Sequence, residues 1–331
     1  MSEPCVAVFS SSWTEAPRSE LAAAVRSIAG ALTRLAEVDV FVPGTGQPFG
    51  DGAFDVTPIS ERDPPRRSYT AAVVEPYPGG AAAMARPVAS PAPGTPVFAV
   101  GAAPTPVDGI LDVGLDCVDA GGGGARCRSG VDPEVHRVGL YARVHPGARS
   151  RRHYGLGDVP EYLLVLGDRQ IVPAQCSPTD RVRWLLARFA RRHVVVLEGG
   201  VARAWRSRSC VAEFDVHTRM DLWILMAQAW AVVDLLPGDL YARECVEALR
   251  LGVPVVVPDG GAAARLARAG GGLRFASTAD LLACVDALFD PAARASLGAA
   301  GRQATDRWYG DPHAFVARLG GALGLPTRRA S

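Results

Sequence analysis

Residues 234–258 read DLLPGDLYARECVEALRLGVPVVVP. The end of one β-rich run is followed by a Pro-Gly turn, a segment with apolar residues at helical spacing, and a second Val-rich run. This pattern predicts strand, turn, helix and strand, with the helix over 241–251 and Asp239 at or near its N-cap. The first turn of a helix has unpaired backbone N–H groups and the positive end of the dipole. We therefore expect this segment to hold an anionic ligand such as a phosphate.

Apolar runs and helical segments alternate around this stretch. Strands are predicted at 162–166, 194–197, 231–235 and 253–257, and helices at 181–191, 221–229 and 241–251. Repeated βα alternation predicts a doubly wound parallel sheet. Ligands of such sheets lie beyond the carboxyl ends of the strands, which directs attention to the loops 167–169, 198–200 and 236–239.

The N-terminal half predicts a smaller parallel α/β domain. Its strands are expected at 5–10, 38–42, 69–74 and 96–100, with helices at 20–35 and 80–85, and surface loops over the Gly-rich segment 101–135. We place the domain boundary near residue 150. The expected domains are a Rossmann-like domain over 1–150 and a second one over 151–306, followed by a tail over 307–331.

Bulk composition limits the classes of function. The 331 residues suffice for two domains, and 48% hydrophobic against 21% charged residues describes a well-packed protein. The net charge of +1, with arginine supplying all the basic side chains, gives no field that suggests nucleic acid. The seven cysteines form no CxxC pair and the histidines show no metal spacing, so we expect a cytoplasmic protein without a metal site. We find no signal-peptide pattern and no apolar run long enough for a membrane span.

The stretch 239–257 resembles the donor-site motif of retaining glycosyltransferases of the GT-B fold, family 4 type. Two acids, Asp239 and Glu247, are separated by seven residues and followed by Gly252-Val-Pro254. The resemblance covers about residues 138–305. It implies an acceptor-side domain over 1–150 and a donor-binding domain over 151–306 that face across a cleft, with the tail over 307–331 crossing back to the first domain. It also implies transfer of a hexosyl group from a UDP- or GDP-sugar with retention. It implies no metal and no cofactor beyond this co-substrate.

The resemblance also implies roles for individual residues. Glu247 would bind the ribose hydroxyls, Asp239 would orient the sugar, and Arg169 would hold the diphosphate. The full donor set adds Gly238, Leu240, Tyr241, Ala242 and Arg243 at the helix start, Gly199 and Gly200 near the base, and Asp215 in the base pocket. The lysine that the family carries five residues after the arginine is Ala174 here. Arg243, or else Arg181, is expected to replace it.

The acceptor side is less defined. Ser11, Ser12 and Trp13 lie in the loop that the family places near the reacting centre, and Glu75 ends a predicted strand. The loop is equally compatible with a polar turn. The acceptor can be a saccharide, a glycolipid or a small metabolite. A basic run that includes Arg149, Arg151 and Arg152 fits either the inner surface of a membrane or a solvated linker.

Two other functions remain open. A GT-B protein that binds a sugar nucleotide or a partner without turnover is favoured by the missing lysine. A nucleotide-sugar epimerase of the same fold would need acid and base residues that face one sugar, and the sequence shows no such set. Simpler interpretations also exist for single residues: Asp239 as a plain N-cap, Glu247 as an acid paired with Arg243 or Arg250, and Arg169 as a solvated charge.

Overall fold

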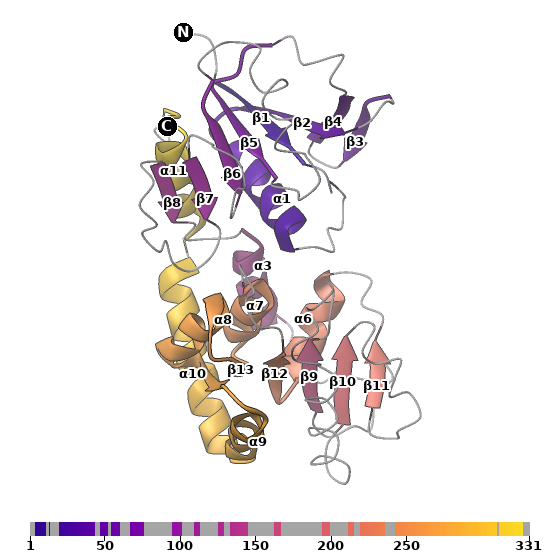
Figure 1. The fold of residues 1–331 in the computed structure, drawn as a ribbon, viewed down its shortest axis with the longest axis vertical. Coiled ribbons are helices and arrows are strands. Elements are labelled where there is room, and N and C mark those ends of the chain that lie inside the picture. Colours follow the sequence, from indigo (N-terminus) through magenta and orange to yellow (C-terminus); the bar gives the residue numbers. More distant parts are fainter. Residues whose placement is uncertain are drawn as a thin grey trace. The chain divides into compact units, whose positions relative to one another are not determined.

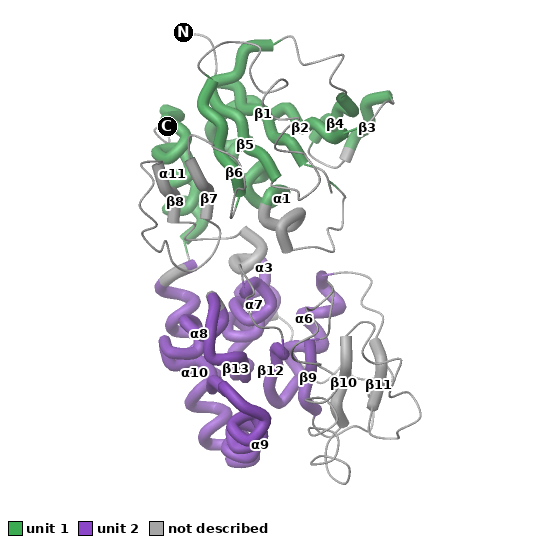
Figure 2. Tube along the Cα trace, viewed as in Figure 1, with its two compact units in different colours: residues 1–134, 311–331 green, residues 135–310 purple. Residues whose placement is uncertain are grey.

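The computed structural model forms two compact units (Figure 2). Unit 1 comprises residues 1–134 and 311–331, and unit 2 comprises residues 135–310. The structure describes residues 4–10, 13, 20–43, 47–51, 54–59, 67–75, 95–100, 109–112, 125–128, 133–144, 162–166, 194–198, 211–214, 219–235, 242–309 and 311–326. The sequence placed the boundary near residue 150, whereas the division falls between Glu134 and Val135.

The sheet of unit 1 is built on a central apolar strand. Its strands are β1 (Cys5–Phe9), β2 (Glu37–Pro43), β3 (Phe49–Asp51), β4 (Phe54–Ile59), β5 (Ala71–Val74), β6 (Val97–Val100), β7 (Gly109–Asp112) and β8 (Ala125–Arg128). Their order is β3-β4-β2-β1-β5-β6-β7-β8, and all pairs are parallel except β3 with β4. Every residue of β1 is buried, as expected for a parallel strand covered on both faces.

Helices α1 (Glu20–Leu32) and α11 (Pro312–Ala322) pack together in unit 1 (Figure 1). Val6 and Val8 of β1 and Ile28 of α1 share one core with Phe315 and Leu319 of α11. The opposite face of the sheet buries alternate residues of the same strands, including Cys5, Ala7 and Phe9. The chain after residue 310 therefore completes the core of unit 1.

Unit 2 has a fully parallel sheet in the order β11-β10-β9-β12-β13-β14. Its strands are β9 (Tyr162–Leu166), β10 (Val194–Glu198), β11 (Val211–Phe214), β12 (Ala231–Asp234), β13 (Val255–Pro258) and β14 (Gly272–Phe275). Its helices are α3 (Pro133–Val144), α6 (Arg219–Gln228), α7 (Arg243–Leu251), α8 (Gly261–Leu266), the π-helical turn η2 (Ala267–Gly271), α9 (Thr278–Ala287) and α10 (Pro291–Tyr309). The predicted α/β class with doubly wound parallel sheets is confirmed.

The expected loop segment 101–135 is wrong in part. It contains β7 and β8, which extend the sheet of unit 1 beyond β6, and the first residues of α3. Each of these strands has four residues, and β7 itself begins with glycine, so neither gives a clear period-2 signal. The helices expected at 80–85 and 181–191 lie outside the described residues.

No described helix combines the length and the apolar character that crossing a bilayer requires.

Candidate functional site

The order of strands locates a binding edge in unit 2. From β9 the chain continues to β10 and β11 on one side, and then returns to β12 on the other side of β9. Such a switch point leaves a crevice beyond the carboxyl ends of the two strands, where α/β proteins bind ligands. The segments of chain that follow β9 and β12 contain Arg169 and Asp239. Both residues lie outside the described part of the chain, as do Gly199, Gly200, Asp215, Gly238, Leu240 and Tyr241.

Helix α7 begins later than the sequence indicated. Its N-cap is Ala242, with φ 46° and ψ 33°, and its first helical residue is Arg243. A residue in the left-handed region cannot continue a right-handed helix, so the helix cannot extend back to Asp239. The N-cap is therefore Ala242 and not Asp239, which the sequence placed at or near that position. The positive end of the dipole lies at Ala242 and Arg243, the last two residues of the predicted phosphate-binding turn.

The C-terminal end of α7 explains the Gly-x-Pro part of the motif. Gly252 adopts φ 82° and closes the helix with its N–H group on the Leu249 carbonyl, 2.9 Å away. Val253 N–H bonds to the Ala248 carbonyl at 2.9 Å. This left-handed cap suits glycine because glycine has no Cβ. The chain then turns directly into β13, which pairs with β12.

Glu247 lies at the centre of a buried network of four charges. Its side chain is completely buried on α7. The Glu247 Oε1 atom accepts hydrogen bonds from Arg219 Nε at 3.0 Å and from Arg243 Nε at 3.1 Å. The same Arg219 guanidinium donates from Nη1 to Glu244 Oε1 at 2.7 Å. Two cations and two anions thus join the start of α6 to the first turns of α7.

Burial and charge act against each other at this network. Burial raises the pKa of the Glu247 carboxyl above its ordinary value, while the guanidiniums of Arg219 and Arg243 act to lower it. Burial also acts to lower the pKa of Arg219, but the carboxylates of Glu247 and Glu244 outweigh this effect and raise it. Arg219 therefore stays charged, and the Glu247 carboxylate depends on its two arginines for its charge.

Arg219 was not among the residues chosen from the sequence. It is separated from Glu247 by 28 residues, and the two meet only because α6 packs against α7. No local spacing signals this contact. The alternative that Glu247 pairs with Arg243 as a surface acid is half right, because the pair exists but is buried. Arg250 instead pairs with Asp306 of α10.

Unit 1 has its own switch point, between β1 and β5. Ser10 follows β1 and Glu75 follows β5, and Ser10 Oγ donates a hydrogen bond to Glu75 Oε2 at 2.5 Å. Both side chains are buried. Trp13, named from the sequence as an acceptor-side residue, lies in the core and meets the Phe54 ring edge-on at 5.1 Å. Ser11 and Ser12 lie outside the described residues.

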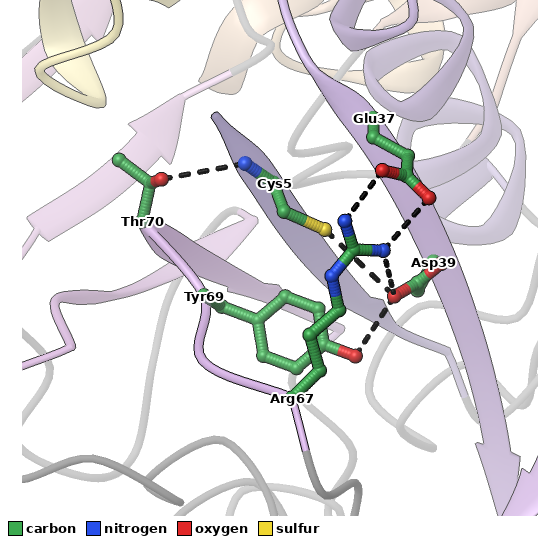
Figure 3. Close-up of polar contacts among 6 residues, drawn as sticks. All are labelled: Cys5, Glu37, Asp39, Arg67, Tyr69 and Thr70. Carbon is green, nitrogen blue, oxygen red and sulfur yellow. Dashed lines mark hydrogen bonds and ion pairs between the residues drawn. The ribbon is translucent and has the colours of Figure 1, made fainter. Parts of the chain in front are cut away.

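A second polar cluster lies at the opposite, amino edge of the unit 1 sheet (Figure 3). Asp39 Oδ2 accepts a hydrogen bond from the Tyr69 hydroxyl at 2.9 Å and lies 3.8 Å from Cys5 Sγ. Arg67 binds both carboxylate oxygens of Glu37, a contact that lowers the pKa of Glu37. Ligands of α/β sheets bind at the carboxyl edge, so we assign this cluster a structural role.

Within the described residues, no group of three or more histidine, cysteine, aspartate or glutamate side chains is arranged to hold a metal ion.

No protein-family model matches this sequence, and the curated protein sequences give no match either. Solved structures do resemble the chain over almost its whole length. WaaG, a glycosyltransferase involved in lipopolysaccharide biosynthesis, is 16% identical, with a TM-score of 0.66 over 96% of this chain and 100% of that chain.

Two further solved structures are similar to this chain over nearly its whole length. Sucrose-phosphate synthase from Thermosynechococcus elongatus is 13% identical, with a TM-score of 0.71 over 96% of this chain and 98% of that one. HepE from Anabaena, in complex with UDP and glucose, is 13% identical, with a TM-score of 0.68 over 97% and 99%. At such identities the likeness concerns the fold. The predicted fold is confirmed: the chain has the GT-B fold of these glycosyltransferases.

Proposed function

We propose that the protein is a glycosyltransferase that takes its sugar from a nucleoside diphosphate at the carboxyl edge of the unit 2 sheet. The observation that carries this proposal is the placement of Glu247. It lies on the helix that follows the switch-point strand β12, within a fold shared along nearly the whole chain with WaaG and sucrose-phosphate synthase. HepE, with the same fold, has been solved with UDP-glucose, which supports a sugar nucleotide as the ligand.

The roles of the donor residues follow from the motif and from the network. Glu247 accepts hydrogen bonds from the ribose hydroxyls, and Asp239 orients the transferred sugar. Arg169 and the N–H groups at the start of α7 bind the diphosphate, where their charge stabilises the leaving group. The family has a phosphate-binding lysine at the position of Ala174, and Arg243 supplies the missing positive charge. Its position as the first residue of α7 supports this assignment.

We further propose that transfer proceeds with retention and without a metal ion. Arginine side chains and the helix N-terminus supply positive charge at the place where a metal would otherwise act. The hydroxyl that receives the sugar belongs to a saccharide, a glycolipid or a small metabolite. Positioning of donor and acceptor then provides most of the rate enhancement.

Calorimetric titration with UDP-glucose and with GDP-mannose tests the proposal. We expect one of them to bind, and Glu247→Ala to weaken that binding by about tenfold or more, as expected for hydrogen bonds to a charged group. Glu37→Gln is the matched control, because Glu37 is also an acid paired with an arginine but lies at the amino edge of unit 1. Its binding should equal that of the wild type.

Turnover is measured in the same preparations by following slow hydrolysis of the bound donor. Hydrolysis that disappears in Glu247→Ala supports a transferase. If neither sugar nucleotide binds, the proposal is wrong. If one binds but no hydrolysis or transfer is detected with any acceptor, the protein is a sugar-nucleotide binder without turnover.

A further inference from the structure

The two oxygens of Glu247 are in different states. Oε1 accepts two hydrogen bonds, from Arg219 Nε and Arg243 Nε, so both of its lone-pair directions are used. Oε2 lies 2.7 Å from Arg219 Nη2, but this ion pair lacks the alignment of a hydrogen bond. Within the described residues, Oε2 accepts no hydrogen bond although it is completely buried.

A buried carboxylate oxygen with unused acceptor capacity is unfavourable unless something fills it. The neighbouring Arg219 Nη2 likewise donates no well-aligned hydrogen bond within the described residues. A hydroxyl group has both an O–H donor and acceptor lone pairs. A hydroxyl can therefore donate a hydrogen bond to Oε2 and accept one from Arg219 Nη2, whereas an apolar group could do neither.

Arg219 is also held from its other side. Its Nη1 donates to Glu244 Oε1 at 2.7 Å, and this ion pair is largely buried. Glu244 and Glu247 are three positions apart, so they lie on one face of α7 on successive turns. The guanidinium plane of Arg219 is thus fixed by two carboxylates. The orientation of Glu247 is fixed in turn by the guanidinium.

We propose that Arg219 is a positioning residue for the sugar-nucleotide donor: it holds Glu247 by a hydrogen bond to Oε1 and an ion pair with Oε2, and Oε2, which accepts no aligned hydrogen bond within the described residues, accepts a ribose hydroxyl. This inference rests on the proposed function, because it presupposes that the ligand of Glu247 is a nucleotide. It adds a residue from outside the donor motif, and it assigns the two carboxylate oxygens different tasks. Arg219 acts through Glu247.

Nucleotides that lack one hydroxyl provide the test. Titration calorimetry compares UDP with 2′-deoxy-UDP and 3′-deoxy-UDP, and GDP with the corresponding deoxy forms. We expect the wild type to bind the full nucleotide about tenfold or more tightly than at least one deoxy form, the ratio typical of a hydrogen bond to a charged group. In Arg219→Met this ratio should fall toward one, and in Arg219→Lys it should be intermediate.

The ratio separates positioning from a merely structural role. Loss of structure would weaken the full and deoxy nucleotides equally and leave the ratio unchanged, and that result would overturn the inference. Arg268→Met is the matched control, because Arg268 is an arginine of unit 2 paired with Asp259 on the surface. It should keep both affinity and ratio. If Arg219→Met does not fold, Arg219→Lys decides the question: its ratio should be below that of the wild type, and an unchanged ratio would overturn the inference.

The pH dependence gives an independent readout. The charged groups that act on Glu247 within the described residues are Arg219 of α6 and Arg243 and Glu244 of α7. Removing Arg219 leaves burial opposed by Arg243 alone, so the pKa of Glu247 rises further. If Arg219 acted only by keeping Glu247 charged, the deoxy ratio in Arg219→Met would recover fully as the pH is raised. Because Arg219 also orients the carboxylate, we expect this ratio to stay below that of the wild type at every pH, and full recovery would overturn the positioning role.

Failure of this inference is distinguishable from failure of the proposed function. A wild type that binds UDP or GDP without discriminating the deoxy forms overturns the role of Oε2 and leaves nucleotide binding in place. An Arg219→Met variant that keeps the wild-type ratio overturns the role of Arg219 alone. A wild type that binds neither nucleotide overturns both proposals.

Discussion

Cys5 differs from an ordinary thiol because its sulfur is buried beside the Asp39 carboxylate. Burial, and then the negative charge of Asp39, raise the pKa of Cys5 from 9.0 to about 12. The reactive form of cysteine is the thiolate. A shift of about three pKa units lowers the thiolate fraction at neutral pH about a thousandfold. The residues around Cys5 at the amino edge (Figure 3) therefore keep its thiol protonated and make it unreactive toward electrophiles.

We predict that Cys5 resists alkylation in the folded protein. Iodoacetamide at pH 8 should modify Cys5 only after unfolding in guanidinium, whereas Cys284, which is partly exposed, should react earlier. Peptide mass spectrometry after timed quenching measures both rates. Rapid modification of Cys5 in the native protein would contradict the burial of its thiol.

The same thiol affects stability at high pH. Above about pH 9 the unfolded chain loses the Cys5 proton, while the folded chain keeps it up to about pH 12. The unfolded state then binds fewer protons, so the free energy of unfolding decreases as the pH rises through this window.

The residues of the site were only partly predictable. Glu247 could be identified because Asp239, Glu247 and Gly252 belong to one short segment and have a characteristic spacing in the sequence. Arg219 could not, because its contact with Glu247 depends on the packing of two helices that are remote in sequence. The start of α7 was misplaced because Asp239 is a favoured N-cap residue, and no propensity indicates that Ala242 adopts a left-handed conformation.

At the scale of elements, α10 approaches α7 closely because its facing residues are glycines. A Cβ at Gly298 would overlap the Gly252 carbonyl oxygen, and a Cβ at Gly301 would lie 2.6 Å from a Leu249 methyl carbon. Arg302 of the same helix donates to the Leu251 carbonyl at 2.8 Å and neutralises the negative end of α7. The packing of α10 thus supports the helix that carries Glu247.

Gly298→Ala should destabilise unit 2, although alanine favours helix by about 1 kcal/mol over glycine. The added methyl group meets backbone, which cannot move aside as a flexible side chain can. We expect a net cost of about 1–3 kcal/mol, the usual range for overpacking. Thermal or urea unfolding measures it.

Gly30→Ala in α1 is the control for this prediction. A Cβ at Gly30 meets nothing within 4 Å, and the residue is exposed near the end of its helix. Here the helix propensity should prevail, and the variant should be as stable as the wild type or slightly more stable. A Gly298→Ala variant that behaves like Gly30→Ala would contradict the close contact of α10 with α7.

Elements with strong periodicity were predictable, and short ones were not. Strands β1 and β9 each consist of five consecutive apolar residues, so their assignment needed no tertiary information. Strands β7 and β8 exist because an open sheet edge at β6 accepts further parallel strands. This pairing depends on the tertiary structure of unit 1, and the Gly-rich sequence of the segment gives little local strand signal.

At the scale of the whole molecule, each compact unit has a core of its own. One core cluster of unit 2 joins its strands to α9, and the core of unit 1 contains residues from both ends of the chain. Phe315, Leu319, Leu323 and Leu325 fill the latter from the C-terminal side. The unfolding of the protein is therefore expected to show two transitions, one for each unit.

Phe315→Ala should separate these transitions. Phe315 is 2% exposed, and truncation of a buried phenylalanine typically costs about 3–5 kcal/mol. We expect the transition of unit 1 to move to lower temperature, while the transition of unit 2 and its affinity for UDP or GDP stay unchanged. Arg318→Ala, on the exposed face of the same helix, should shift neither transition.

Calorimetric scans with and without nucleotide identify which transition is which. A ligand that binds only folded unit 2 raises the temperature of that transition alone, because binding stabilises the state that binds. If the transition that nucleotide raises is also the one that Phe315→Ala lowers, the two units unfold as one cooperative body. The C-terminal helix would then stabilise the donor site as well as the core of unit 1, and truncation after residue 310 would weaken nucleotide binding.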